Sequence, residues 1–199
     1  FLESANQLAA CTHVVFANSN LRPLVDVAFD DVFAPQCRLF GTLHPGYAFK
    51  KRTLLRWYPG TFETNPKSTA AIGRGRRRYF AGGLNGGTLA EWLRMCGHLS
   101  VNIELDKRRN VNGTGWAIWH DESHINYYFN RCHAPRVLGP EYLYPEGWSL
   151  PVTPKVLILD KSRLGGTSAC MALRREVFRR LHGFDGALGV GAPLRAAED

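Results

Sequence analysis

The residues best suited to catalysis lie together in the segment WHDESHIN, Trp119 to Asn126, where two adjacent carboxylates lie between two histidines. One chemistry open to such a pair of acids is glycosyl transfer, which passes through an oxocarbenium-like state that a carboxylate beneath the anomeric carbon stabilises or traps as a covalent adduct. We therefore assign Glu122 to the sugar carbon and Asp121 to hydrogen bonds with sugar hydroxyls. The spacing alone does not decide which acid has which role.

Two other readings of the same segment are open. Carboxylates are favoured in the first turn of a helix by the helix dipole and the unpaired N–H groups, so a purely structural role is one of them. The other is a zinc site, because His120 and His124 would share one helical face in an HDxxH pattern that resembles HExxH. Against zinc, Asp121 replaces the usual glutamate and no third ligand is signalled.

The elements that must position this segment are predicted to alternate between strands and helices. The apolar run Thr12 to Ala17 predicts a strand that ends at Asn18-Ser19-Asn20. Polar residues at the carboxyl end of a buried strand lie where open α/β sheets bind ligands, although Asn and Ser are also good turn formers. The other predicted elements are a helix over 1–11, a strand over 79–84, Gly86-Gly87 leading into a helix capped by Thr88 and ending near His98, a helix from near Trp116 to Cys132, a loop and strand over 134–143, a strand over 155–159 and an arginine-rich helix over 171–181.

Composition limits the classes of partner. Lysine and arginine total 25 against 17 acidic residues, a net charge of +8, which favours an anionic partner such as a nucleotide phosphate. No stretch approaches the roughly 20 apolar residues of a membrane-spanning helix, so we expect a soluble chain. Five cysteines without a CxxC pair favour a reducing compartment over a zinc ribbon or a disulfide framework.

Several ordered motifs resemble glycosyltransferase family 6, which includes the blood-group A and B enzymes, from Phe1 to about Gly166. The motifs are LFGTLHPGY at 39–47, FETNPKSTA at 62–70, YFAGGLNGG at 79–87, WHDESHIN at 119–126 and PEYLYPEGW at 140–148. The resemblance implies an α/β GT-A fold, with a mixed central sheet flanked by helices. The first βαβ segment of that fold should precede Phe1, so the chain resembles a fragment.

The family implies retaining transfer of galactose or N-acetylgalactosamine from a UDP-sugar to the 3-hydroxyl of a galactosyl acceptor, which is often fucosylated. By position, Glu122 matches the catalytic carboxylate, and Ala81 and Gly83 match the positions that discriminate the two donor sugars. The expected donor-binding residues are Asn18, Asn20, Ala81, Gly82, Gly83, His120, Asp121 and Lys161, and the expected acceptor-binding residues are His44, Thr69 and Trp119. Neither nucleic acid nor a membrane span is expected.

Asn18-Ser19-Asn20 departs from the Asp-x-Asp metal motif of mammalian members and resembles the NxN of bacterial members. Carboxamides are poor ligands for a hard divalent cation, so we expect transfer without a metal or any other cofactor. The charge on departing UDP would then be met by the basic loop over 74–78 and by Lys161. A bacterial member would act in the cytoplasm, and a eukaryotic one in the Golgi lumen.

Residues 1–165 are therefore interpreted as a family 6 catalytic domain that lacks its start. Residues 166–199 resemble instead part of a family 2 glycosyltransferase, ending at Glu198-Asp199. Two alternatives from other classes remain: a catalytically incomplete fragment that binds sugar or nucleotide, and the zinc hydrolase considered above.

Overall fold

The computed structural model of the chain describes residues 11–50, 60–73, 77–160 and 170–173. Its strands are β1 His13–Ala17, β2 Leu21–Pro23, β3 Leu39–Leu43, β4 Phe80–Thr88, β5 Arg136–Leu138, β6 Tyr144–Pro145, β7 Val156–Ile158 and β8 Cys170–Leu173. Its helices are α2 Phe29–Val32, α3 Pro45–Ala48, α4 Leu89–Arg108 and α5 His120–Tyr127, with short helical turns at Val111–Gly113, Tyr128–Cys132 and Pro140–Tyr142. The predicted helix over 1–11 lies outside the described residues.

Five strands form the main sheet in the order β5-β3-β4-β1-β8. β3 and β5 run parallel, while the other neighbouring pairs are antiparallel. A bulge between Gly41 and Thr42 shifts the register of β3 on β4. The strands β2, β7 and β6 form a second, smaller sheet with one antiparallel and one parallel pair. The predicted mixed α/β class is therefore confirmed.

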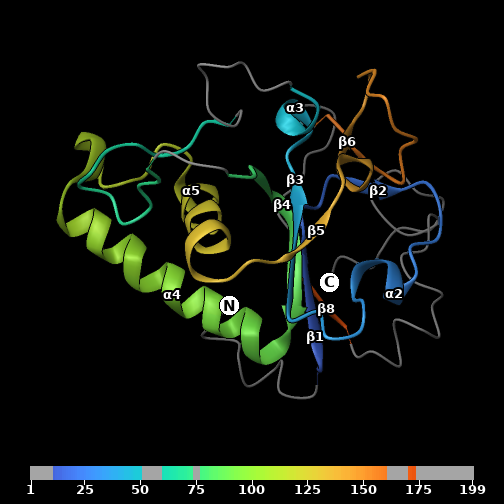
Figure 1. Cartoon of the computed structure of the whole chain (residues 1–199), viewed down its shortest axis with the longest axis horizontal. Helices are drawn as coiled ribbons and strands as arrows, with labels where there is room; N and C mark the ends of the chain where they lie inside the picture. Colours follow the sequence, from blue (N-terminus) through green and yellow to red (C-terminus); the bar gives the residue numbers. More distant parts are fainter. Residues whose placement is uncertain (1–10, 51–59, 74–76, 161–169, 174–199) are drawn as a thin grey trace.

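The main sheet separates two hydrophobic clusters. Helices α4 and α5 cover one face, and α2 and the small sheet lie on the other side (Figure 1). Successive side chains of a strand point to opposite faces, so Val14 and Leu39 join the cluster under α4 and α5. Their neighbours Val15 and Phe40 join the cluster on the other face. Burial on both faces explains why β1 is an apolar run rather than an alternating one.

Three sequence-based predictions of the elements need correction. The strand predicted to end at Leu84 is longer, since β4 continues through Gly86 and Gly87 to Thr88. Thr88 is the N-cap of α4 as predicted, but the helix runs ten residues past His98, to Arg108. Residues 171–173, predicted as the start of a helix, belong instead to the strand Cys170–Leu173, which pairs with β1. The division of the chain at 165/166 stays a prediction.

Candidate functional site

Glu122 lies in the first turn of α5, where two hydrogen bonds from the start of β4 hold its carboxylate. The Tyr79 hydroxyl donates to Oε1 at 2.8 Å, and the Gly82 backbone N–H donates to Oε2 at 2.7 Å. A Cβ atom on Gly82 would lie 3.4 Å from Oε2, so the strand approaches the carboxylate with no side chain between them. Both oxygens are therefore fixed in direction.

Asn126 fastens the same helix to the same strand. Its Oδ1 accepts from the Phe80 N–H at 2.8 Å, and its amide donates to the carbonyls of Phe80 at 2.8 Å and Glu122 at 2.9 Å. These groups are buried, so an unpaired partner would cost about 1–3 kcal/mol. Glu122 and Asn126 are four residues apart and share one helical face, which explains why both meet β4.

The Glu122 pocket, with a volume of about 310 Å³, lies at one edge of the main sheet. Asn18 follows β1 and His44 follows β3, so the carboxyl ends of two strands meet there, beside the start of β4. Five of the predicted site residues line the pocket: Asn18, His44, Ala81, Gly83 and Glu122. The rest of the lining is apolar and consists of Leu21, Pro45, Leu143, Pro145, Trp148 and Ile158. A few polar groups on mainly apolar walls are typical of a small-molecule site.

His44 is the N-cap of α3, and its Nδ1 accepts a hydrogen bond from the Gly46 N–H at 3.1 Å. This contact assigns the proton of the neutral ring to Nε2. Burial lowers the pKa of His44, Glu122 partly opposes this, and Lys50 reinforces it. The ring is therefore neutral near pH 7 and presents one hydrogen-bond donor at the pocket wall.

The two asparagines of the Asn18-Ser19-Asn20 segment have different surroundings. The Asn18 side chain lies over Gly83, where an added Cβ would be 2.9 Å from Nδ2. The Asn20 side chain is buried and donates to the Leu159 carbonyl at 2.8 Å. Among the described residues, its Oδ1 has no hydrogen-bond partner. Asn18 thus lines the pocket, whereas Asn20 joins the end of β1 to the end of β7.

The first three members of WHDESHIN face outward. Asp121 and His120 are exposed, and half of the Trp119 side chain is accessible. His120 has a positive φ of 48° and stacks on the Trp116 ring at 5.2 Å between centroids. A non-glycine residue in this region costs of order 1–3 kcal/mol, and such strain is concentrated at functional sites. None of the three outward residues lines the Glu122 pocket.

The two histidines of the HDxxH pattern do not meet. His120 is exposed, whereas His124 is buried with its Nε2 3.6 Å from a carboxylate oxygen of Asp106. Burial lowers the pKa of His124, although Asp106 acts in the opposite direction. Within the described part of the chain, no three His, Cys, Asp or Glu side chains could together hold a metal ion. The geometry therefore gives no support to the zinc alternative.

Thr69 lies against α4 and does not line the pocket. Its N–H donates to Asp106 Oδ1 at 2.7 Å, and its hydroxyl donates to the Asn102 carbonyl at 3.1 Å. The neighbouring Ser68 hydroxyl donates to Asp106 Oδ2 at 2.5 Å. A role of Thr69 in acceptor binding stays a prediction. Lys161 and residues 74–76 of the basic loop lie outside the described residues.

Sequence reasoning named neither Tyr79 nor Asn126 as a site residue, and it also missed Glu63. The buried Glu63 carboxylate accepts from the N–H groups of Asn65 at 2.7 Å and Ile118 at 2.8 Å, and from the Asn112 amide at 2.9 Å. Burial alone would raise the pKa of Glu63, but these hydrogen bonds outweigh it and lower the pKa. Glu63 thus fixes the loop that leads into α5.

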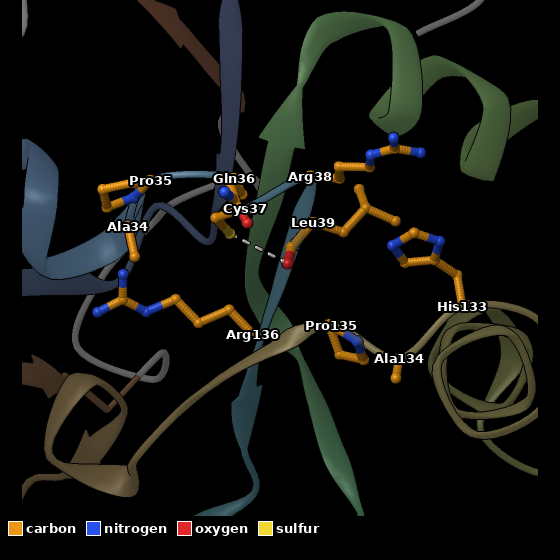
Figure 2. A pocket seen from close by; sticks show the side chains of 10 residues that line it. All are labelled: Ala34, Pro35, Gln36, Cys37, Arg38, Leu39, His133, Ala134, Pro135 and Arg136. Carbon is orange, nitrogen blue, oxygen red and sulfur yellow. Dashed lines mark hydrogen bonds between the residues drawn. The ribbon is translucent and has the colours of Figure 1, made fainter.

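A second pocket, also of about 310 Å³, lies before the starts of β3 and β5, at the opposite edge of the sheet (Figure 2). Figure 2 shows the Arg38 and Arg136 side chains extending to different sides of it. The Cys37 thiol donates to the Leu39 carbonyl at 3.3 Å, and burial raises its pKa against the effect of Arg136. No predicted site residue lines this pocket. The candidate active site is therefore the Glu122 pocket.

Comparison with known proteins identifies relatives of the region that forms this site. The sequence profile of glycosyltransferase family 6 matches residues 22–162. The rat histo-blood group ABO system transferase 1 is 35% identical over 130 residues, which cover 62% of this chain and 35% of that protein. The mouse globoside alpha-1,3-N-acetylgalactosaminyltransferase 1 is 32% identical over 139 residues, covering 67% and 37%. The human alpha-1,3-galactosyltransferase 2 is 28% identical over 137 residues, covering 67% and 36%.

The family match covers most of the pocket, and the similarity extends over only part of each relative. The chain spans 35–37% of the length of these three relatives. The family profile includes His44, Ala81, Gly83 and Glu122, and it begins after Asn18. In the part of the chain that the structure describes, no helix is long and apolar enough to cross a bilayer.

Proposed function

The chain belongs to glycosyltransferase family 6, and from this we propose that it is a retaining hexosyltransferase with a GT-A fold. It moves N-acetylgalactosamine or galactose from a UDP-sugar to the 3-hydroxyl of a galactosyl acceptor. One observation carries the proposal: Glu122, held by Tyr79 and Gly82, shares a pocket with three predicted donor-binding residues and one predicted acceptor-binding residue, namely Asn18, Ala81, Gly83 and His44. The names of two relatives specify α-1,3 transfer of these two sugars, which fits the same donor set.

In the proposed reaction, the bond from the sugar C1 to the UDP oxygen breaks while the Glu122 carboxylate faces C1. Positive charge develops on C1, and a carboxylate already fixed in direction stabilises it without reorganisation. The acceptor 3-hydroxyl oxygen then bonds to C1 on the face that UDP left and gives its proton to the departing UDP phosphate oxygen, so configuration is retained. Neutral His44 contributes an N–H donor at the pocket wall, where it can orient the acceptor hydroxyl.

Release of UDP from a UDP-sugar tests the proposal most directly. We expect the chain to liberate UDP from UDP-GalNAc or UDP-Gal, and to do so faster with a galactosyl acceptor. A chain that binds the nucleotide sugar without releasing UDP would fit the binding-module alternative instead. Nuclear magnetic resonance of the product would establish the linkage and the anomeric configuration.

Metal independence is a further part of the proposal, supported by the neutral amide of Asn18 at the pocket wall. Carboxamides bind hard divalent cations weakly, so transfer should not depend on Mn²⁺ or Mg²⁺. We expect full activity in excess EDTA, measured as UDP release with both donors. Loss of transfer in EDTA that Mn²⁺ restores would contradict this part of the proposal and leave the reaction class intact.

Donor choice is proposed to favour UDP-GalNAc, because Ala81 and Gly83 present little side-chain volume to the pocket. In Gly83→Ala, the new Cβ would lie 2.9 Å from Asn18 Nδ2 and would displace that amide, which lines the pocket. We expect kcat/KM to fall for both donors, and further for the bulkier GalNAc. A methylene of pocket volume is worth about 1–3 kcal/mol, so the donor ratio should shift roughly 10-fold towards Gal.

The measurement is kcat/KM for both donors on wild type and Gly83→Ala, together with the melting temperature of each protein. An equal fall for both donors in a destabilised protein would show that the glycine serves the backbone and does not select the donor.

A further inference from the structure

We propose that Tyr79 is a positioning residue for Glu122 and the last member of a chain of hydroxyl groups that begins at Tyr47. The inference rests on the proposed role of Glu122 and adds to it the device that fixes the carboxylate before substrate binds. It also links the loop after β3, which carries His44, to the acid on α5.

This series of hydrogen-bonded hydroxyl groups comprises three residues from three different segments. The Tyr47 hydroxyl donates to Thr61 Oγ1 at 3.3 Å, and the Thr61 hydroxyl donates to the Tyr79 oxygen at 3.3 Å. Tyr79 then donates to Glu122 Oε1 at 2.8 Å, the shortest of the three bonds. Thr61 and Tyr79 each accept from one hydroxyl and donate to the next group, and such an arrangement polarises the donors toward the carboxylate.

The packing around the Tyr79 ring fixes the direction in which its hydroxyl points, which is toward Glu122. The residue is 4% exposed, and its ring centroid lies 5.0 Å from those of Tyr47 and Phe62 and 5.6 Å from that of His44. The backbone at Gly60 packs on the ring, because an added Cβ there would lie 2.6 Å from Tyr79 Cδ2. A ring enclosed on these sides keeps one orientation, which is what a positioning group requires.

The Tyr79 hydroxyl keeps its proton over the whole working range of pH. Burial raises the pKa of Tyr79 well above its usual value, Thr61 opposes the rise, and the Glu122 carboxylate adds to it. The hydroxyl therefore acts as a donor, and the carboxylate is held by two donors, with the Gly82 N–H as the second.

Tyr79→Phe removes the hydroxyl and keeps the ring, so the aromatic packing survives. Glu122 would then be held through one oxygen only, and the carboxylate could turn away from C1. Small displacements of a reacting group cost up to about 100-fold, so we expect kcat to fall about 10-fold or more. KM for the donor should stay close to wild type, because the pocket walls do not change.

The matched control is Tyr128→Phe, which removes a hydroxyl from another buried tyrosine that packs beside His98 and away from the pocket. Its kcat and KM should equal those of wild type. The decisive comparison repeats Tyr79→Phe in the Glu122→Gln background. If Tyr79 acts through the carboxylate, it should cost nothing further there, whereas damage to the fold would lower activity by the same factor in both backgrounds.

Two results would overturn the inference. One is a fall in kcat by the same factor in the wild-type and Glu122→Gln backgrounds, and the other is a changed KM with an unchanged kcat. A crystal structure of Tyr79→Phe gives a readout that does not need turnover, and we expect it to show the Glu122 carboxylate rotated away from its wild-type direction. If wild type releases no UDP, the proposed function fails, and this structure still tests the positioning. A Glu122 carboxylate that keeps its direction in the variant would refute the role of Tyr79.

Discussion

Glu122→Gln is expected to reduce transfer by about 100-fold or more and to leave donor affinity within a few fold of wild type. The carboxylate charge is needed chiefly when positive charge develops on the sugar carbon, so its loss affects the transition state more than the bound donor. The glutamine fits the same place. Its oxygen can accept from the Gly82 N–H, and its amide can donate to the Tyr79 hydroxyl, which also accepts hydrogen bonds.

The matched control for this prediction is Asp121→Asn, which removes the same charge one residue earlier. Asp121 is exposed and does not line the pocket, and its expected role is to bind the donor sugar. This variant should raise the KM for the donor more than it lowers kcat. Steady-state kinetics and donor titration calorimetry on both variants separate the two roles. Wild-type turnover in Glu122→Gln would show that another group supports the sugar carbon.

The local sequence predicted the segments around the pocket well, because their signals are short-range. The apolar run before Asn18 became β1, and the first-turn acids of WHDESHIN became the start of α5. Asn18, His44 and Glu122 come together only in the tertiary structure, which the spacing of residues in the sequence does not predict. Their proximity was expected only from the resemblance to a family. Tyr79 was missed because an aromatic residue before a strand looks the same whether it fills a core or aims a hydroxyl.

The errors occurred where tertiary contacts outweigh local propensity. The segment from Met171 is rich in helix formers, yet Cys170–Leu173 pairs with β1, because an unpaired strand edge offers hydrogen bonds to any segment that can extend. The helix after Thr88 was predicted to end near His98, but α4 continues to Arg108. The strand before this helix was predicted to end at Leu84, but β4 includes Gly86 and Gly87, where neighbouring strands approach too closely for side chains.

That last difference leads to the second prediction, on stability. A Cβ on Gly86 would overlap the Val14 carbonyl oxygen of β1 and lie 2.6 Å from the Phe40 ring of β3. The carbonyl belongs to the backbone of the central sheet and cannot turn aside. Overpacking of a core typically costs 1–3 kcal/mol, and a clash with backbone lies at the upper end, so Gly86→Ala should destabilise the chain by about 3 kcal/mol or more.

Gly97→Ala is the matched control, because the same methyl group added in the middle of α4 would meet nothing within 4 Å. Glycine in a helix interior costs about 1 kcal/mol relative to alanine, so this variant should be more stable than wild type by a similar amount. Urea unfolding followed by tryptophan fluorescence measures both, since Trp92 lies on the buried face of α4. If Gly86→Ala unfolds at the same urea concentration as wild type, β1 and β3 do not enclose β4 at this distance. The predicted order of stability, Gly97→Ala above wild type above Gly86→Ala, depends on the packing around each glycine, because the chemical change is identical.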